Sequence, residues 1–467
     1  MVLRGRSTGG SVRSMTVDQY VTQAQDRLLD ELFEFLRIPS VSTDPARAAD
    51  TRRAAEFTAA ALERAGLEAR IHPTARHPVV TAVGPHVPGA PTVLVYGHYD
   101  VQPAEPVDAW SSDPFEPHVV DGTIIARGAS DDKGQVYAHI KGVEALMAVD
   151  GALPLNVKFV VEGEEEIGSP NLGAFLEAER ELLAADVVVI SDGAMAAPET
   201  PTITYGLKGL TYATLFARGA GRDLHSGAYG GGVPNVLNAI AAMLAGLHDA
   251  DGRVLVPGFY DDVRDLDEAE RAQIAKAPFS EEAFREDAGV SATPGERGYT
   301  LLERIWARPT LDVNGLSGGF QGDGSKTVIA AEGMAKLSAR LVPDQDPRDI
   351  FAKIERHLLE VAPEGIEVAL QVEGLGHPAM TPLDSESVRA AGDALRTVWG
   401  SEPVFARTGG SIPVVADFQR VLGADPVLIG FGLESDRAHS PNEKFDVLNY
   451  LNAVRVSAEL LRALARR

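Results

Sequence analysis

The sequence contains no cysteine. This absence excludes disulfide bonds and thiolate metal sites, so any metal site in this chain must use histidine and carboxylate side chains. The chain also has no uninterrupted apolar stretch near the roughly 18 to 20 residues that a membrane span requires. Its first residues, MVLRGRSTGGSVRSM, carry arginines but not the apolar core of a signal peptide. We therefore expect a soluble, cytoplasmic protein without a membrane partner, in which about the first 14 residues are disordered; whether translation starts at Met1 or Met15 stays open.

Positive charge is scarce relative to negative charge. The 43 lysines and arginines face 67 aspartates and glutamates, which gives a formal net charge of −24. Such a balance repels phosphate backbones and anionic lipid surfaces. We expect no nucleic acid partner, and solubility alone accounts for most of the surface acidity.

The first 200 residues show an alternating pattern of strands and helices. A chain of 467 residues, 45% of them hydrophobic, is too long for one core and predicts two or three domains. Apolar residues recur at helical spacing first, and strands and helices then alternate. This rhythm predicts an α/β domain with a mainly parallel sheet covered by helices. The helical stretches are 16–36, 47–65, 132–148 and 171–184, and the apolar strand-like runs are 68–72, 79–84, 92–97, 155–161 and 186–190.

The pattern changes after about residue 205. The runs TYATLFARG, TVIAAEGMAKLSARLVP and IEVALQVEG alternate like half-exposed strands, and two helical stretches separate them. We predict an inserted α+β domain of antiparallel strands and two helices over 206–382, with 251–310 as an excursion within it. The α/β domain, which the later motifs mark as the catalytic one, then consists of residues 1–205 and 383–467.

The run LVYGHYDVQ ends an apolar strand on a histidine and an aspartate. His98 and Asp100 share one face of an extended chain, because side chains two residues apart point the same way. Taken alone, this pair is explained by a hydrogen bond at a strand end. Further polar side chains also fall at predicted strand ends or helix starts: Asp131 and Asp132, Glu164, Glu165 and Glu166, Asp192, and His439.

Each of these residues has an ordinary structural explanation by itself, such as a helix N-cap, a solvated turn or a surface histidine. Together they gather at one edge of one sheet, where ligands of such sheets bind. Unpaired carboxylates in one cleft would repel each other unless a cation held them. Histidines and carboxylates without cysteine suit zinc or a similar divalent ion, and two ions bridged by one carboxylate use all these ligands better than one ion. Neighbouring glutamates project differently, so one can bind metal while the other serves as general base.

Seven segments carry a family resemblance. The chain resembles the two-zinc metallopeptidase family that includes carboxypeptidase G, aminoacylase and succinyl-diaminopimelate desuccinylase, and most of all its carnosine dipeptidase branch. The resemblance spans nearly the whole chain in order. The segments are GHYDVQPAEPVDAWSSDPFEP, ARGASDDKG, EGEEEIGS, RDLHSGAYGG, KTVIAAEGMAKLSARLVP, GGSIPV and AHSPNEKF.

The resemblance assigns roles to residues of the metal centre. It implies His98 and Asp192 as ligands of one zinc, Glu166 and His439 as ligands of the other, Asp131 as the bridge, Glu165 as general base, and Asp100 as the carboxylate that orients His98. A zinc-bound imidazole usually donates its other nitrogen to a carboxylate, which agrees with the role of Asp100. One alternative stays open: because Glu164 is an additional acid, a shift of one residue would give Glu164 and Glu165 the roles of base and ligand.

The inserted domain resembles the lid of the family, which carries substrate contacts and the dimer interface. The resemblance implies that His225 reaches the active site of a partner subunit and stabilises the oxyanion. It implies substrate contacts for Thr327 and for Arg340, whose guanidinium suits a carboxylate. The GGS loop, Gly409, Gly410 and Ser411, offers backbone amides where the chain approaches a ligand closely.

The expected activity is hydrolysis of dipeptides or short peptides with a free carboxylate by a homodimer with two divalent ions per chain. Zinc is the expected metal, with manganese or cobalt as alternatives. An N-acyl amino acid deacylase with the same metal centre is the second candidate. A catalytically silent metal-binding protein is the third, and the retention of Glu165 and Glu166 speaks against it. The side-chain preference of the substrate and the extent of lid closure stay open.

Overall fold

The computed structural model describes residues 15–410 and 413–466, which form two compact units. Unit 1 contains the described residues up to Pro201, together with Glu386–Pro403 and the residues from Leu428 onward, and unit 2 contains Thr202–Ser385 and Val404–Val427. Unit 2 thus includes 404–427, which the predicted boundaries place in the catalytic domain. The reason is that β17 (Val404–Thr408) pairs in parallel with β9 (Thr202–Leu207). The expected disorder of the first 14 residues falls outside the described part of the chain.

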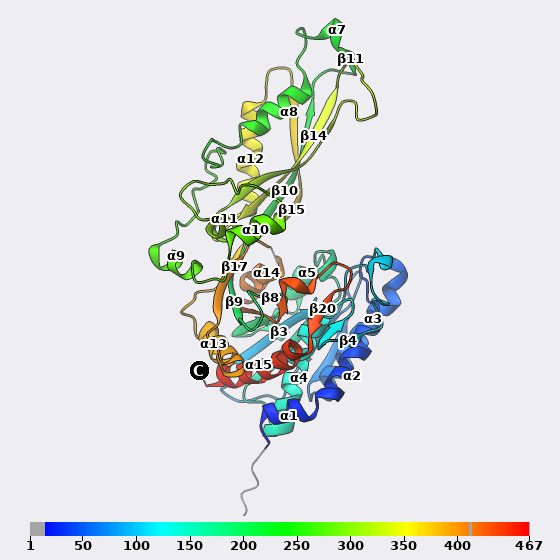
Figure 1. The fold of residues 1–467 in the computed structure, drawn as a ribbon, viewed down its shortest axis with the longest axis vertical. Coiled ribbons are helices and arrows are strands. Elements are labelled where there is room, and N and C mark those ends of the chain that lie inside the picture. The colour runs from blue at the N-terminus through cyan, green and yellow to red at the C-terminus, as the bar shows by residue number, and fades with distance from the viewer. Residues whose placement is uncertain (1–14, 411–412, 467) are drawn as a thin grey trace, which may run out of the picture. The chain divides into compact units, whose positions relative to one another are not determined.

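The sheet of unit 1 has parallel strands at its centre, and helices such as α2 (Gln25–Leu36), α3 (Ala48–Arg64) and α15 (Val447–Ala465) accompany its strand β3 in Figure 1. Strand β3 lies between β6 and β7 and is parallel to both, while β1 and β2 run antiparallel at one end. The register pairs His98 with Glu162, so the chain leaves β3 and β6 at the same edge. The predicted mainly parallel sheet is therefore confirmed. In the described part of the chain the sheet has nine strands, and those that lie wholly or partly in unit 1 are, in order, β1 (Glu68–His72), β2 (Val79–Val83), β6 (Asn156–Glu162), β3 (Thr92–His98), β7 (Val187–Ile190) and β18 (Asp425–Gly430).

Helix α4 (Lys133–Asp150) is the central helix of unit 1. It is buried on nearly all sides along its first four turns, because β3 lies on one side and the C-terminal helix α15 (Val447–Ala465) on another. Even Lys141 is fully buried there, where its amine pairs with Glu31 and Glu144. The predicted helix over 16–36 is two helices that meet at Ala24. The other helices are α1 (Val17–Gln23), α2 (Gln25–Leu36), α3 (Ala48–Arg64), α5 (Leu172–Ala178), α6 (Arg180–Leu183) and α13 (Glu386–Trp399).

Short elements complete unit 1. Three short strands form a separate antiparallel sheet, two others pair in parallel, and single 3-10 turns link longer elements. In the described ranges, no helix is both long enough and apolar enough to cross a membrane. The short strands are β4 (His118–Val120), β5 (Thr123–Ile125) and β20 (Lys444–Asp446) in the antiparallel sheet, and β8 (Ala194–Met195) and β19 (Gly432–Leu433) in the parallel pair. The 3-10 turns are η1 (Pro45–Arg47), η2 (Val107–Ala109), η3 (Glu165–Ile167) and η4 (Glu434–Asp436).

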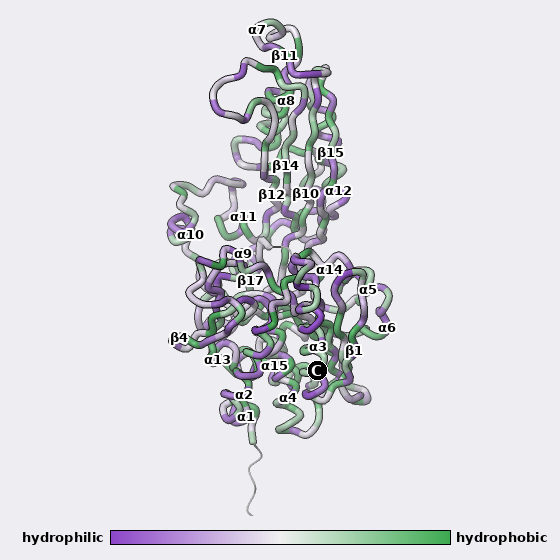
Figure 2. The backbone as a smooth tube through the Cα atoms, turned by 90° about the vertical axis from the view of Figure 1, so that its right-hand side faces the viewer, coloured by the Kyte–Doolittle hydropathy of each residue, from purple (hydrophilic) through white to green (hydrophobic). Residues whose placement is uncertain are grey.

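Unit 2 is built on a four-stranded antiparallel sheet, whose strands run side by side in Figure 2. Helices α8 (Val236–Ala245) and α12 (Pro347–Val361) pack on the sheet, and their apolar side chains form a core with inward residues such as Leu215 and Leu337. The predicted antiparallel sheet with two helices is confirmed. Strand β12 was not predicted, because its polar residues and glycine hide the alternation. The strands, in order, are β12 (Thr310–Gly318), β14 (Glu332–Leu341), β10 (Gly209–Arg218) and β15 (Glu367–Gly376).

The predicted excursion contains three helices of unit 2. The buried guanidinium of Arg308 forms two hydrogen bonds of 2.7 Å with the carboxylate of Glu296, which ties the end of the excursion to the loop between α10 and α11. Elsewhere in unit 2, β9 lies between β16 and β17, and β11 pairs with β13. The remaining elements are α9 (Glu268–Ile274), α10 (Glu281–Ala288), α11 (Leu301–Ala307), β11 (Leu224–His225), α7 (Ser226–Tyr229), β13 (Val328–Ile329), β16 (Ala379–Met380) and α14 (Pro413–Leu422).

Gly163 provides a test of the packing at the carboxyl edge of the unit 1 sheet. A Cβ added to Gly163 would overlap the phenol ring of Tyr99, which is fully buried and donates a hydrogen bond to the Pro78 carbonyl. We expect Gly163→Ala to lower the free energy of unfolding by about 1 to 3 kcal/mol, because the ring must move. Gly221→Ala is the matched control, since its added methyl meets no atom within 4 Å. Urea unfolding of both variants measures the difference, and equal stability would contradict this packing.

Candidate metal centre

The predicted metal ligands lie in segments at the ends of different elements of unit 1. Three lie at or after the ends of strands, one lies just before a helix, and one lies in a loop. Because the central strands are parallel, the segments that follow them meet at one edge of the sheet. His98 is the last residue of β3, Glu166 lies in η3 after β6, Asp192 lies two residues after β7, Asp131 lies two residues before α4, and His439 lies in the loop between η4 and β20.

The structure brings these five side chains into two groups that share one residue. The ligand atoms of His98, Asp131 and Asp192 lie within 4.8 Å of one another, and so do those of Asp131, Glu166 and His439. The two carboxylate oxygens of Asp131 face different histidines: Oδ1 lies 3.2 Å from His98 Nε2, and Oδ2 lies 2.8 Å from His439 Nε2. His439 Nε2 is also 3.2 Å from Glu166 Oε2. Asp131 therefore has the geometry of a bridging carboxylate.

The chemistry of the donor set fits divalent cations. Three carboxylates and two imidazoles, without sulfur, are the ligands that zinc and similar ions take. Burial and the negative charge of Asp131 raise the pKa of Asp192 to about 7. Burial opposes ionisation of Asp131 too, but hydrogen bonds from His439 and His98 outweigh it and lower the pKa of Asp131. Cations in both groups would offset the repulsion among these carboxylates.

Asp100 contacts both sides of the centre. The Nδ1 atom of His98 lies 3.1 Å from the Asp100 carbonyl oxygen and 3.4 Å from Oδ1, which leaves Nε2 facing Asp131. The carboxylate of Asp100 also accepts hydrogen bonds from the backbone N–H groups of Glu165 (3.3 Å) and Glu166 (3.1 Å). These contacts support the orienting role predicted for Asp100. They add a second role, because the same carboxylate fixes the backbone that carries the two glutamates.

The three adjacent glutamates point in different directions. Glu164 is buried, and its carboxylate accepts hydrogen bonds from Thr74 Oγ1 (2.9 Å), the His77 N–H (2.7 Å) and Asn171 Nδ2 (2.7 Å). Glu164 is thus engaged with a neighbouring loop, whereas Glu166 belongs to a candidate ligand group. This arrangement favours the register in which Glu165 is the base over the register shifted by one residue.

Glu165 is half-buried in an acidic environment. Burial, reinforced by the negative charges of Asp192 and Glu166, raises the pKa of Glu165 to about 9 in the metal-free centre. Cations in the two ligand groups would lower this pKa and leave Glu165 as a carboxylate that can accept a proton from water.

Gln102 contacts the predicted ligand Glu166, a contact that was not predicted from the sequence. Its Nε2 donates a hydrogen bond of 2.8 Å to Oε2 of Glu166. The spacing contained the signal, because residues 98, 100 and 102 fall on the same face of an extended segment.

The remaining predicted site residues belong to unit 2. His225 is exposed on β11, opposite Val328, and the neighbouring Ser226 N–H donates to the Thr327 carbonyl, so the structure places His225 and Thr327 near each other. The Nδ1 of His225 accepts a hydrogen bond from the Gly227 N–H (2.9 Å), which leaves Nε2 as the donor of the neutral ring. Arg340 is half-buried on β14, opposite Leu210 and Thr310.

The glycine-containing loop after β17 is described only in part. The Gly410 N–H donates to Thr408 Oγ1 at 3.2 Å, and Gly409 precedes it. Ser411 lies outside the described residues, so its predicted substrate contact stays a prediction.

The fold and the candidate centre place the chain among the metal-dependent hydrolases, and comparison with known proteins specifies the family. The family model for Peptidase family M20/M25/M40 matches residues 94–463. The human Beta-Ala-His dipeptidase is 33% identical over 96% of this chain and 92% of that protein. The Cys-Gly metallodipeptidase DUG1 of Candida albicans is 33% identical over 92% of this chain and 93% of that protein.

A solved structure agrees with these relatives. The M20 family metallo-carboxypeptidase Sso-CP2 from Sulfolobus solfataricus superposes with a TM-score of 0.82 at 35% sequence identity, covering 95% of this chain and 100% of that chain. The chain therefore belongs to Peptidase family M20/M25/M40, and the family predicted from the sequence motifs is confirmed.

Substitution of adjacent glutamates tests the division of roles between them. We expect Glu165→Gln to lower the rate of peptide hydrolysis by about 10² to 10⁴-fold or more while both metal ions stay bound, because a general base is not a ligand. Glu164→Gln is the matched control and should retain activity with reduced stability, since its amide oxygen can still accept from Thr74 and His77 but its NH₂ group faces the Asn171 Nδ2 donor. Steady-state kinetics and metal analysis of the purified variants measure both effects. Loss of metal from Glu165→Gln with partial activity would move the base to Glu164.

Proposed function

We propose that the chain is a metal-dependent dipeptidase that hydrolyses dipeptides or short peptides with a free carboxylate. The observation that carries this proposal is Asp131, whose two oxygens face the two histidines of adjoining ligand groups beside Glu165. The relatives add the substrate class. Two are named as dipeptidases and one as a carboxypeptidase, and both activities cut near a free carboxylate.

Two divalent ions per chain fit the two ligand groups. His98 and Asp192 would hold one ion, Glu166 and His439 the other, and Asp131 both. When bound, such ions supply Lewis acidity that polarises the peptide carbonyl and lowers the pKa of water. We propose zinc as the native metal, because the set of histidine nitrogens and carboxylate oxygens suits it, with manganese or cobalt as alternatives.

The chain's own residues move the protons and bind the substrate. Glu165 takes a proton from the attacking water and returns it to the leaving amine, while Asp100 keeps the His98 ring in orientation. His225, which the proposed dimer brings to the active site of the other subunit, donates from Nε2 to the oxyanion there, since its Nδ1 is already an acceptor.

The substrate carboxylate is assigned to unit 2. Arg340 provides a planar cation for it, and the amides around Gly410 and the hydroxyl of Ser411 provide further donors. Thr327, next to His225 in the structure, would contact the body of the peptide. A free carboxylate is therefore the feature that every substrate should share.

A panel of substrates tests this function against the deacylase alternative, which the dipeptidase relatives do not favour. We expect kcat/KM for dipeptides to be at least about tenfold higher than for N-acetyl amino acids with the same C-terminal residue. A tenfold preference corresponds to about 1.4 kcal/mol, which contacts of the active site with the preferred substrate can supply. The assay uses purified protein with zinc, manganese or cobalt, and chelator-treated protein as the inactive control. Faster turnover of the N-acetyl compounds would make the chain a deacylase, and full activity after verified metal removal would overturn the proposal.

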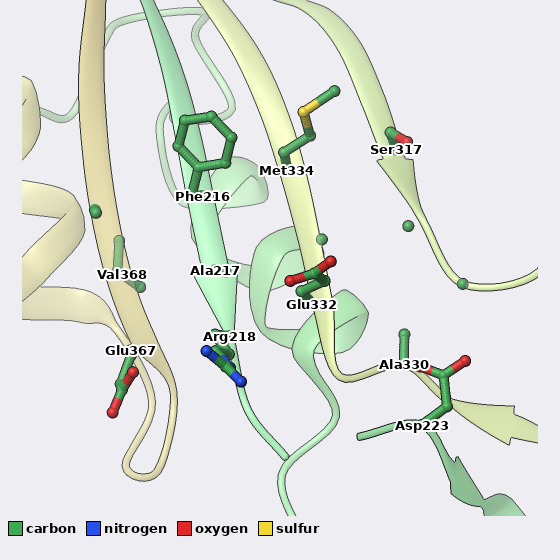
Figure 3. Close-up of a pocket in the computed structure, with 14 residues that line it drawn as sticks. Phe216, Ala217, Arg218, Asp223, Ser317, Ala330, Glu332, Met334, Glu367 and Val368 are labelled. Atoms are coloured by element: carbon green, nitrogen blue, oxygen red, sulfur yellow. The ribbon is translucent and has the colours of Figure 1, made fainter. Parts of the chain in front are cut away.

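The open face of the unit 2 sheet supports a homodimer. A hollow of about 800 Å³ lies on this face (Figure 3). Figure 3 shows Phe216 of β10 and Met334 of β14 on adjacent strands, with Arg218, Glu332 and Glu367 near the strand ends. Phe216 is 42% exposed, which is unusual for a large aromatic side chain on a sheet. We propose that a second copy of the chain covers this open face of the unit 2 sheet. The cytoplasmic location expected from the sequence stays a prediction.

Subunit complementation tests whether the dimer completes the active site. We expect His225→Ala to lower kcat by about 10² to 10³-fold with a modest change in KM and intact metal, because an oxyanion donor acts mainly in the transition state. Mixing His225→Ala with Glu165→Ala chains, under conditions of subunit exchange, should restore activity, since one site of the mixed dimer has both residues. Absence of rescue in a mixture shown by mass spectrometry to contain heterodimers would mean that each chain uses its own His225 or that this histidine is structural.

A further inference from the structure

The side chain of Glu443 is a buried carboxylate within the segment that also carries His439. It is fully buried, and its two oxygens accept four hydrogen bonds. Oε2 accepts from Arg127 Nη1 (2.8 Å) and the Gly128 N–H (2.9 Å). Oε1 accepts from the N–H groups of Ser130 (2.9 Å) and Asp131 (3.0 Å).

Three of these four donors are backbone amides of the loop that ends at Asp131. The loop contains no strand or helix that could fix its path before α4 begins at Lys133. The carboxylate of Glu443 supplies the acceptors that regular structure supplies elsewhere, and charge-assisted hydrogen bonds of this kind are roughly twice as strong as neutral ones.

Arg127 anchors the other side of this contact. Its guanidinium lies 5.3 Å from the ring centroid of Trp110, and its Nη2 donates to the Pro103 carbonyl at 3.1 Å. The carboxylate of Glu443 therefore has a fixed counter-charge as well as fixed amide donors, and it is held rigidly against the Asp131 loop.

We infer that Glu443 is a positioning residue that fixes the Asp131 loop so that both oxygens of Asp131 face the two metal sites. The inference rests on the proposed two-metal function. Glu443 lies four residues after His439, so one short segment supplies a ligand and also holds the bridging ligand. The sequence motif AHSPNEKF thus contributes two side chains to the centre rather than one.

Only a carboxylate of this length satisfies the contact. Each oxygen accepts two donors, so a glutamine in either orientation would place its NH₂ group against two N–H groups. An aspartate keeps the charge but is one methylene shorter, so it cannot reach both pairs of donors from the same backbone. Substitution should therefore release the loop even when the chain folds.

Asn442 offers a matched control in the adjacent position. Its Oδ1 accepts from the N–H (2.7 Å) and Oγ (2.8 Å) of Ser111, and its Nδ2 donates to the Ala109 carbonyl (3.0 Å). Asn442 thus holds a different loop with three hydrogen bonds. Its φ of +61° is readily adopted by glycine, so Asn442→Gly removes these bonds without backbone strain.

The experiment compares Glu443→Gln, Glu443→Asp and Asn442→Gly in the full-length chain, with Zn²⁺ as the probe. We expect Glu443→Gln to bind Zn²⁺ about 10 to 100-fold more weakly in competition with a chromophoric chelator, as is typical when a residue supporting a ligand is lost. Hydrogen–deuterium exchange of the metal-free chain should rise over 126–133. In the zinc-loaded enzyme kcat should fall with little change in KM, because substrate contacts are assigned to other residues.

Asn442→Gly should instead raise exchange over 105–112. It should leave Zn²⁺ affinity within about twofold of the wild type, since the loop that Asn442 contacts, at Ala109 and Ser111, carries no predicted metal ligand. Wild-type Zn²⁺ affinity in Glu443→Gln, or an equal loss in Asn442→Gly, would overturn the inference. If Glu443→Gln does not fold, Glu443→Asp decides in the same way. Zinc affinity and exchange are measured without any substrate, so failure of this inference is distinguishable from failure of the proposed dipeptidase activity.

Discussion

The accumulation of negative charge at one buried edge of a sheet is the constraint on which the rest of unit 1 depends. Asp131, Glu165, Glu166 and Asp192 meet there, and their mutual repulsion together with burial raises the pKa of both Glu165 and Asp192. The imidazoles of His98 and His439 lie among these carboxylates, and cations in the two groups would offset the remaining repulsion. The position of Asp131 between the two histidines is what makes the two candidate groups share one residue.

A second set of buried carboxylates accepts hydrogen bonds from backbone amides of the segments at and around the centre. Asp100 accepts the N–H groups of Glu165 and Glu166, Asp132 accepts the His98 N–H, and Glu164 accepts the His77 N–H. Glu443 accepts three further amides. The loops at the strand ends have no ladder partners for their backbone donors, and a buried donor without an acceptor is costly, so side-chain carboxylates take that place. The carboxylates of the region thus fall into two sets: those of the candidate ligand groups and those that accept hydrogen bonds from backbone amides.

Unit 2 has a different physical organisation. One face of its sheet packs against α8 and α12 and forms an apolar core, while the opposite face mixes Phe216 and Met334 with charged side chains. A sheet with one covered and one open face usually alternates apolar and polar residues, and the aromatic exception on the open face is what a contact with another molecule explains. Residues predicted to meet the substrate, His225, Thr327 and Arg340, belong to this unit.

The sequence by itself determined the class of fold and the residue types of the centre. Alternation of strands and helices fixes a parallel sheet, and parallel strands bring their carboxyl ends to one edge, so His98, Asp192 and the glutamates could be grouped from their positions alone. Strand β12 was not predicted, because its glycine and polar residues hide the alternation of apolar and polar side chains. The tertiary structure alone decided which of three adjacent glutamates joins a candidate ligand group, how the oxygens of Asp131 are divided, and that Glu443 contacts the loop before Asp131. The contacts of Glu443 join segments more than 300 residues apart, and no local spacing encodes which side chain a distant backbone amide will meet.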